Sequence, residues 1–415
     1  MRYITMNLSK NIHVVLATAH PEVANRLLIS MQQALPSFDV QASVLLFGMA
    51  QPIKPCKFSI PVDLIECFVN YPPIVDNRNI CQLHLKQKMN ERGGIGFILD
   101  DDLLWSLPEL SFINIINQLN ELGCDMAFST LSGDSPIPKE YTRTSPLLDV
   151  LLAIRDDGVG GDIFQINEYL SPVESVVTST DSINAHHDFY SFNPRDFNRY
   201  NVNVATLKWD DFIDCLVKGK ATTRNIKLPS KITPANGRER GGATIVLNSE
   251  VLLCKNDSLR YSNFISRRSD MVMASDAFTC NFKLFNTPPL LEHRRDETFD
   301  THDSKKLIGD ILGYALVESR DVTTFCQKKF ALNLSKRIEQ TTLLLIESSK
   351  MMRLLGKWLI KNNHIGAEQI SSLNSMASEN EQVVLDIKLI DLDEVIKAFK
   401  IFATNRNNTE SLMAG

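Results

Sequence analysis

The chain has 415 residues, more than one typical domain holds, so at least two structural units are expected. Hydrophobic residues make up 44% of the sequence and charged residues 22%, which is a globular balance. The formal net charge of -5 argues against a general nucleic-acid binder, whose domain would usually be basic. It leaves room for a local basic pocket that holds a phosphorylated ligand.

The cysteines and the apolar segments indicate in which cellular compartment the protein is expected. The eight cysteines are scattered without a CxxC pair, so we expect reduced and mostly buried thiols, as in a cytosolic protein. The apolar run at residues 12–19 is too short and too β-branched for a membrane helix, and the amino terminus lacks the pattern of a signal peptide. We therefore expect a soluble, cytoplasmic protein without a membrane span.

The first 150 residues alternate between strand and helix patterns. Apolar runs rich in Val and Ile predict buried strands, and apolar residues at three- and four-residue spacing predict helices between them. The predicted strands are residues 12–19, 40–47, 95–99 and 125–130, and the predicted helices are residues 21–35, 79–91 and 110–122. This alternation indicates an α/β sheet, which binds ligands outside the carboxyl ends of its strands.

The rest of the chain has a different character. Residues 150–300 are less regular, with strand-like pieces at 202–207 and 244–247. After about residue 303 the apolar spacing is helical. The predicted helices are residues 306–318, 322–350, 351–361 and 383–402. We expect a helical carboxyl-terminal module with a packing or partner role, which could form a homo-oligomer.

Three consecutive aspartates, Asp100, Asp101 and Asp102, directly follow the predicted strand at 95–99. Adjacent carboxylates repel one another, so packing does not explain them. If the chain stays extended, Asp100 and Asp102 point to one side and Asp101 to the other. Two carboxylates on one side can share a divalent cation that also binds a diphosphate, an arrangement that Mg²⁺ or Mn²⁺ prefers.

Two other interpretations of the acidic run fit less well. An acidic turn that caps a helix starting near Leu103 needs one aspartate and not three, although it stays open as an alternative. A phosphatase of the haloacid dehalogenase type needs Asp, any residue, Asp, any residue, and then Thr or Val. Here Leu103, Leu104 and Trp105 follow the run, which excludes that motif.

The order of these elements resembles that of the GT-A glycosyltransferases. Their run of strand, helix, Arg-Asn-containing segment, helix and strand ending in Asp-any-Asp is similar to this chain from residue 12 through Asp76-Asn77-Arg78-Asn79 to GFILDDD. Only the DDD run and its approach match sharply. The resemblance implies a GT-A-like, Rossmann-type mixed sheet flanked by helices, with an α-helical carboxyl-terminal module. It divides the chain into a nucleotide-sugar-binding half at 1–150, an acceptor-side half at 151–302 and a helical module at 303–415.

The resemblance also implies roles for individual residues. Asp100 would contact the nucleoside side of the donor with Asp101 beside it, and Asp102 would bind the metal that bridges the two phosphates. A further metal ligand in the family, often His, comes from far downstream, and His293 is the candidate here. A structural or solvated role is about as common for an isolated histidine.

Asp270 is the candidate for the carboxylate that orients or deprotonates the acceptor hydroxyl in this family. It follows Arg267 and Arg268, which would keep the carboxyl ionised by lowering its pKa. An ionised carboxylate suits orientation of a hydroxyl, and it suits general base catalysis if the arginines face elsewhere. A surface ion pair is an equally good account of this cluster.

Three arginines are candidates for binding the donor. Arg78 belongs to the Arg-Asn-containing segment, and Arg268 precedes the Asp270 cluster. Arg240 stands before two glycines that let the backbone approach a ligand, while its guanidinium can fork onto phosphate. A solvated loop is the alternative for Arg240. His186-His187-Asp188 and residues 132–138 are further candidates on the acceptor side.

These features predict a metal-dependent glycosyltransferase of the hexosyltransferase type, using Mn²⁺ or Mg²⁺. It would move a sugar from a nucleoside diphosphate, with UDP the commonest carrier among similar enzymes, to an acceptor hydroxyl. A sugar-phosphate nucleotidyltransferase would carry a Gly-rich loop with Arg and Lys after its first strand, where this chain has Thr18-Ala19-His20-Pro21. A non-catalytic binding or scaffolding protein on a GT-A-like fold is the third possibility.

Overall fold

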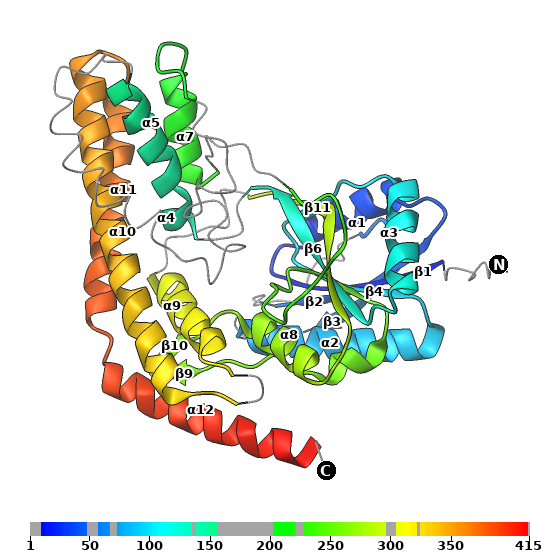
Figure 1. The fold of residues 1–415 in the computed structure, drawn as a ribbon. Coiled ribbons are helices and arrows are strands. Elements are labelled where there is room, and N and C mark those ends of the chain that lie inside the picture. Colours follow the sequence, from blue (N-terminus) through cyan, green and yellow to red (C-terminus); the bar gives the residue numbers. More distant parts are fainter. Residues whose placement is uncertain are drawn as a thin grey trace.

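The computed structural model describes residues 10–47, 57–66, 73–134, 138–156, 202–220, 228–295, 304–321 and 324–413. A twisted sheet with helices on both faces forms one part of the molecule, and long helices form the other (Figure 1). Two predicted acceptor-side segments, His186-His187-Asp188 and part of residues 132–138, lie outside the described residues.

A mixed sheet of nine strands organises the first part. Its order is β3-β2-β1-β4-β8-β6-β11-β5, and β7 pairs with β11. The strands are β1 (Asn11–Thr18), β2 (Asp39–Leu46), β3 (Val62–Glu66), β4 (Ile95–Leu99), β5 (Leu103–Trp105), β6 (Met126–Gly133), β7 (Thr233–Pro234), β8 (Ala243–Val246) and β11 (Leu284–His293). Strands β5, β7 and β8 run antiparallel to their neighbours, and the other six are parallel. The predicted fold class, a mixed α/β sheet flanked by helices with a carboxyl-terminal helical segment, is confirmed.

Two apolar layers cover the faces of this sheet. Side chains alternate along a strand, so Val14 and Leu16 of β1 face one layer while Val15 faces the other. The first layer contains α1 (Pro21–Ala34) and α3 (Glu109–Glu121). The second contains α2 (Ile74–Arg92), the 3-10 helix η2 (Ser249–Leu253) and α8 (Ser269–Thr279). Both candidate ligand-binding helices, α2 and α8, therefore lie on the same face.

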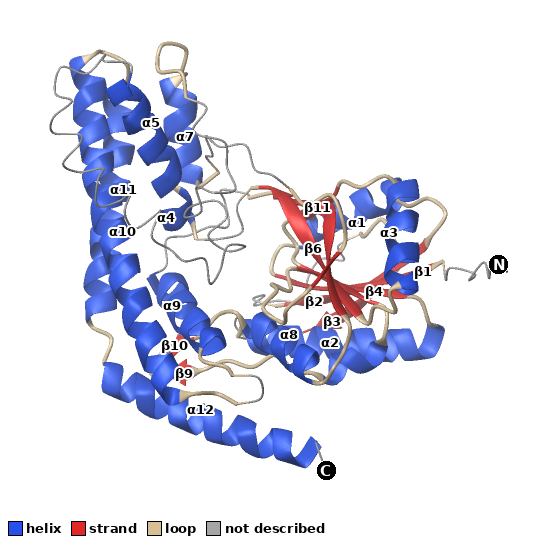
Figure 2. Cartoon of the chain, in the orientation of Figure 1, coloured by secondary structure: helices blue, strands red, loops and turns tan. Residues whose placement is uncertain are grey.

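The helical part draws on two separate stretches of sequence (Figure 2). Its carboxyl-terminal helices are α9 (Ser304–Glu318), α10 (Gln327–Lys361), α11 (Ala367–Lys388) and α12 (Leu392–Met413). Helices α5 (Thr144–Asp156) and α7 (Trp209–Lys218) share an apolar core with α10 and α11, and α4 (Lys139–Thr142) leads into them. Packing thus groups these earlier helices with the carboxyl-terminal ones, and the division of the chain at residues 150 and 302 stays a prediction.

Some local predictions were wrong. Residues 202–207 form turns instead of a strand. The predicted helix at 383–402 is two helices, α11 and α12, separated at residues 389–391, and the predicted break inside 322–361 does not occur because α10 is continuous over 35 residues. Across the described helices, none combines the length and apolar character that crossing a membrane requires.

Candidate functional site

The candidate residues gather at one edge of the sheet. Asp100, Asp101 and Asp102 follow the carboxyl end of β4, and His293 is the last residue of β11. Strand β8 is antiparallel to β4, so its start, preceded by Gly241 and Gly242, lies at the same edge. Two backbone hydrogen bonds hold the edge together. Asp100 N–H donates to the Gly242 carbonyl at 2.9 Å, and Arg294 N–H donates to the Asp102 carbonyl at 2.8 Å.

The acidic run does not continue the strand. Strand β4 ends at Leu99, Asp101 and Asp102 form a turn, and the chain enters β5 at Leu103. The expectation of an extended run with Asp100 and Asp102 on one side is therefore wrong. The alternative of a helix cap is also wrong, because a strand follows the turn. Each carboxylate instead has a different partner.

Asp102 pairs with the predicted downstream histidine. Its Oδ2 lies 2.9 Å from His293 Nε2, and strand pairing places His293 opposite Leu103. The histidine side chain is 8% exposed and the Asp102 side chain 40% exposed, so the carboxylate opens toward solvent. Burial raises the pKa of Asp102, but the hydrogen bond and charge of His293 outweigh it and hold that pKa below its ordinary value.

A divalent cation bound at this pair would have two protein ligands. Neighbouring ligands of octahedral Mg²⁺, each about 2.1 Å from the ion, lie about 3 Å apart. The 2.9 Å between His293 Nε2 and Asp102 Oδ2 is compatible with that spacing, and it is also an ordinary hydrogen-bond distance, so a bound cation would replace that hydrogen bond. In the described ranges no set of three or more His, Cys, Asp or Glu side chains is arranged to hold a metal. The remaining positions would therefore fall to phosphate oxygens and water, as is usual for Mg²⁺.

Asp100 pairs with Arg78 of α2. Arg78 Nη2 donates to Asp100 Oδ1, and Arg78 Nη1 donates to the Gly241 carbonyl at 2.8 Å. Burial lowers the pKa of Arg78, but the Asp100 and Asp270 carboxylates outweigh it and raise that pKa above its ordinary value. A Cβ on Gly242 would lie 2.5 Å from Asp100 Oδ2, so a larger residue here would displace the Asp100 carboxylate. The Asp100 side chain is 43% exposed, close to the exposed fraction of Asp102.

Asp101 is fastened to the end of β1. Thr18 Oγ1 donates to Asp101 Oδ2 at 2.5 Å, and the His20 N–H donates to the Thr18 hydroxyl at 2.8 Å. Burial raises the pKa of Asp101 to about 6. This contact joins the carboxyl ends of β1 and β4, and donor binding by Asp101 stays a prediction.

Asp270 lies in the first turn of α8 and faces the same edge. Its Oδ2 accepts from the Gly241 N–H at 2.6 Å, and its Oδ1 accepts from the Met271 N–H at 3.0 Å. Burial raises the pKa of Asp270, but Arg78, Arg240 and the Gly241 hydrogen bond together hold it below its ordinary value. A carboxylate with a low pKa is a weak base, so the geometry suits orientation of a hydroxyl better than removal of its proton.

The remaining two arginines differ in their surroundings. Burial, and then the charge of Arg268, lower the pKa of Arg240, which is half-buried near Asp270. Arg268 Nη2 lies 2.7 Å from Asp310 Oδ2 of α9, and the guanidinium stands 4.8 Å from the centre of the Tyr314 ring. The Arg268 side chain is thus committed to the helical part. A role for Arg240 or Arg268 in donor binding stays a prediction.

Sequence reasoning missed Thr18 and Asp310. Thr18 is the last residue of β1, so the rule that ligands meet the carboxyl ends of parallel strands could have singled it out. Asp310 lies in an otherwise apolar stretch of α9 and is 1% exposed. A buried carboxylate on a helix signals a partner, but the local sequence does not name Arg268 as that partner.

Comparison with known proteins places few constraints on this site. No family model and no curated protein sequence matches the chain. The structure of S. aureus TarS 1–349 in complex with UDP-GlcNAc aligns with a TM-score of 0.37 and 8% identity, over 90% of this chain and 92% of that one. The structure of S. aureus TarS 1–349 aligns with a TM-score of 0.33 and 9% identity, over 95% of this chain and 92% of that one. The structure of S. aureus TarS aligns with a TM-score of 0.34 and 8% identity, over 91% of this chain and 54% of that one. Similarity this low carries no argument about activity. A proposal about activity therefore rests on the geometry at the sheet edge.

Proposed function

We propose that this chain is a metal-dependent glycosyltransferase that moves a sugar from a nucleoside diphosphate to an acceptor hydroxyl. The observation that carries the proposal is the open pair of Asp102 and His293 at the carboxyl edge of the sheet. Ligands of open α/β sheets bind at this edge. A carboxylate and an imidazole 2.9 Å apart there are suited to a cation that also binds a diphosphate.

In this proposal Asp102 and His293 hold Mn²⁺ or Mg²⁺. The bound ion would neutralise the negative charge that grows on the diphosphate leaving group. Arg78 keeps its positive charge and orients Asp100 toward the nucleoside side of the donor. Arg240 lies close enough to Asp270 to add positive charge at the same edge.

Asp270 is the residue we assign to the acceptor. Its two hydrogen bonds to backbone N–H groups fix the carboxylate, and its position at the start of α8 stabilises the negative charge. Such a carboxylate accepts a hydrogen bond from a hydroxyl and holds it near the sugar. Holding reactants in register contributes strongly to rate, because it removes the entropy cost of their encounter.

A sugar-phosphate nucleotidyltransferase is less compatible with the first strand. Strand β1 ends at Thr18 and α1 begins at Pro21, which leaves two residues for the phosphate-binding loop that such an enzyme needs. Thr18 is already bound to Asp101. Both observations support a transferase whose diphosphate is held by a metal instead of a loop.

Thermal unfolding with a panel of nucleotides tests this proposal. UDP, GDP, CDP and ADP are each added with and without Mn²⁺ to the wild type and to Asp102→Asn. A ligand that binds only the native state raises the melting temperature by mass action. We expect one diphosphate to raise it in a manner that requires Mn²⁺ and is lost in the variant. A wild type that no diphosphate and Mn²⁺ stabilise would contradict the proposal and favour a scaffolding protein.

A further inference from the structure

Helix α8 carries Asp270 at one end and is held by the carboxyl-terminal helices at both ends. The residues just before it lie against α9, and its last turns contact Arg320, which follows α9, and Arg406 of α12. The helix itself belongs to the apolar layer under the sheet. It is therefore the element through which the helical part reaches the candidate site.

The amino-terminal end of α8 rests directly on α9. The Arg267 N–H donates to the Gly309 carbonyl at 2.9 Å, and a Cβ on Gly313 would collide with the Arg267 carbonyl oxygen. Arg268 has a left-handed backbone with φ 71°, which is uncommon for a non-glycine residue. The Asp310 carboxylate contacts both arginine side chains, with Arg268 Nη2 at 2.7 Å and Arg267 Nε at 3.4 Å.

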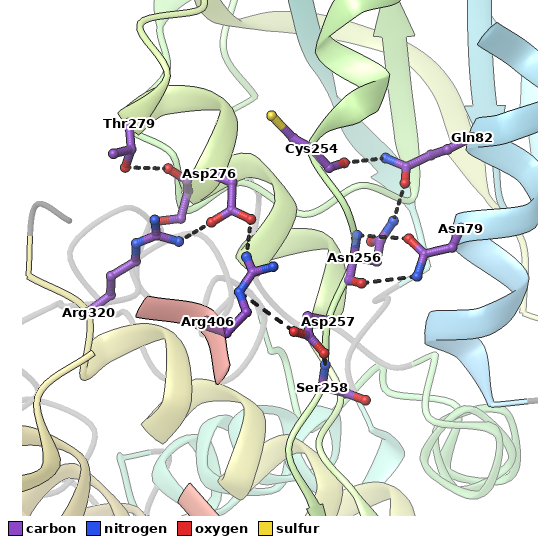
Figure 3. Close-up of polar contacts among 11 residues, drawn as sticks. Asn79, Gln82, Cys254, Asn256, Asp257, Ser258, Asp276, Thr279, Arg320 and Arg406 are labelled. Atoms are coloured by element: carbon purple, nitrogen blue, oxygen red, sulfur yellow. Dashed lines mark hydrogen bonds and ion pairs between the residues drawn. The ribbon is translucent and has the colours of Figure 1, made fainter. Parts of the chain in front are cut away.

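The other end of α8 is held by two arginines (Figure 3). Asp276 accepts hydrogen bonds from Arg320, which follows α9, and from Arg406 of α12. All three side chains are largely buried, at 12% exposure or less for Asp276 and Arg320 and 14% for Arg406. Arg406 Nε also lies 3.6 Å from Asp257 Oδ2. A single residue of α12 thus joins α8 to the segment that precedes it.

That segment is bound in turn to α2, which carries Arg78. Asn79 and Asn256 exchange two hydrogen bonds, with Asn79 Nδ2 donating to the Asn256 carbonyl at 3.0 Å and Asn256 N–H donating to Asn79 Oδ1 at 2.9 Å. Gln82 accepts from Asn256 Nδ2 and donates to the Cys254 carbonyl. Figure 3 shows the two clusters side by side, from α2 through the 254–258 segment to Arg406. The helices that carry Arg78 and Asp270 are therefore both tied to α12.

We infer that the carboxyl-terminal helices set the position of Asp270, and that Asp310 and Arg406 are positioning residues for the transfer step. Buried ion pairs add little net stability, because the cost of removing both charges from water offsets their attraction. Here they have a second consequence, since they fix both ends of the helix that presents the acceptor carboxylate. The inference rests on the proposed function, which supplies the role of Asp270.

The test compares Asp310→Asn and Arg406→Gln with wild type. Each variant removes one charge; Asp310→Asn keeps the side-chain size, and Arg406→Gln shortens the side chain. The two act at opposite ends of α8, so one remains informative if the other folds poorly. Glu381→Gln is the control, because it breaks an ion pair with Arg353 between α10 and α11. Three measurements are made: hydrogen–deuterium exchange of residues 269–279 without ligand, the Mn²⁺-dependent thermal shift with UDP, GDP, CDP and ADP, and steady-state hydrolysis of UDP-, GDP-, CDP- and ADP-glucose.

We expect faster hydrogen exchange in α8 for both variants and the wild-type rate in the control. The diphosphate shift should stay within about a degree of wild type, while kcat for hydrolysis falls at least tenfold with KM within twofold, since small misplacements of a reacting group cost rate more than affinity. Unchanged exchange and unchanged kcat in the variants, beside a normal wild-type shift, would overturn this inference alone. A wild type without any diphosphate shift would overturn the proposed function and this inference with it.

Discussion

Two contacts between an aspartate and a nitrogen-bearing side chain in this chain have similar distances and opposite surroundings. At the sheet edge, Asp102 lies 2.9 Å from His293 and its side chain is 40% exposed. Between α8 and α9, Asp310 lies 2.7 Å from Arg268 and is 1% exposed. A pair that is closed on all sides has no room for a ligand, so its effect stays within the fold. A pair with an open face can add a ligand, so exposure separates the site from the structural contact.

The largest effect should come from breaking the closed pair. Asp310→Ala leaves the Arg268 guanidinium buried without its counter-charge, and such a change costs about 3–5 kcal/mol of unfolding free energy. Urea unfolding measures this loss of stability, with Asp102→Ala as the matched change in the open pair. Equal losses of unfolding free energy in the two variants would contradict the distinction between a closed structural pair and an open site pair.

A smaller effect is expected where the backbone approaches the open site. Gly242→Ala places a methyl group 2.5 Å from Asp100 Oδ2, in a backbone conformation that alanine can adopt. Overpacking of this kind costs about 1–3 kcal/mol and here displaces Asp100 from Arg78. We expect both a lower melting temperature and a weaker diphosphate shift.

Gly366→Ala is the control for that variant, because its methyl group meets only the end of the Gln369 side chain at 3.3 Å. If Gly242→Ala binds diphosphate and Mn²⁺ as wild type does, Asp100 does not border the donor.

Loss of the contact between β1 and the acidic turn should lower the unfolding free energy by an amount similar to that of Gly242→Ala. Thr18→Val removes the hydroxyl that donates to Asp101, and loss of one partner of a partly buried charged group costs about 1–3 kcal/mol. Thr18→Ser keeps the hydroxyl and should retain most of that stability. Urea unfolding of both variants measures the difference, and identical curves would show that the contact is dispensable.

The smallest effect belongs to a pair that is open but away from the site. Glu381→Gln breaks the bidentate contact with Arg353, whose side chains are 51% and 40% exposed. Solvent-exposed pairs are worth under about 1 kcal/mol. Thermal unfolding should detect a shift near zero, with no change in nucleotide binding. A large drop in melting temperature would mean that the exposure of an ion pair does not indicate its role in this chain.

Part of the site could be predicted because its signals are local. Strand β4 and the aspartates after it are contiguous in sequence, and a buried apolar strand followed by charges indicates a ligand-binding edge. His293 could be proposed only through a resemblance, yet it does lie against Asp102, because the sheet order places β11 next to β5.

The direction of each aspartate could not be predicted in the same way. Thr18, Arg78 and His293 come from three distant segments, and the register of the sheet and the packing of α2 decide which carboxylate each one meets. The closed pair of Arg268 and Asp310 is separated by 42 residues and depends on how α9 packs. Helical periodicity predicted α9 itself but carries no information about the loop that rests on it.

The most direct test of a metal site at Asp102 and His293 is Mn²⁺ binding. Electron paramagnetic resonance measures this binding in the presence and absence of UDP, GDP, CDP and ADP. Wild type is compared with Asp102→Asn and His293→Ala, which remove the two ligands separately. We expect one diphosphate to make wild type bind Mn²⁺ and each variant to weaken this binding at least tenfold, because metal–ligand and diphosphate contacts are lost together. Equal Mn²⁺ binding by all three proteins would contradict a donor site at Asp102 and His293.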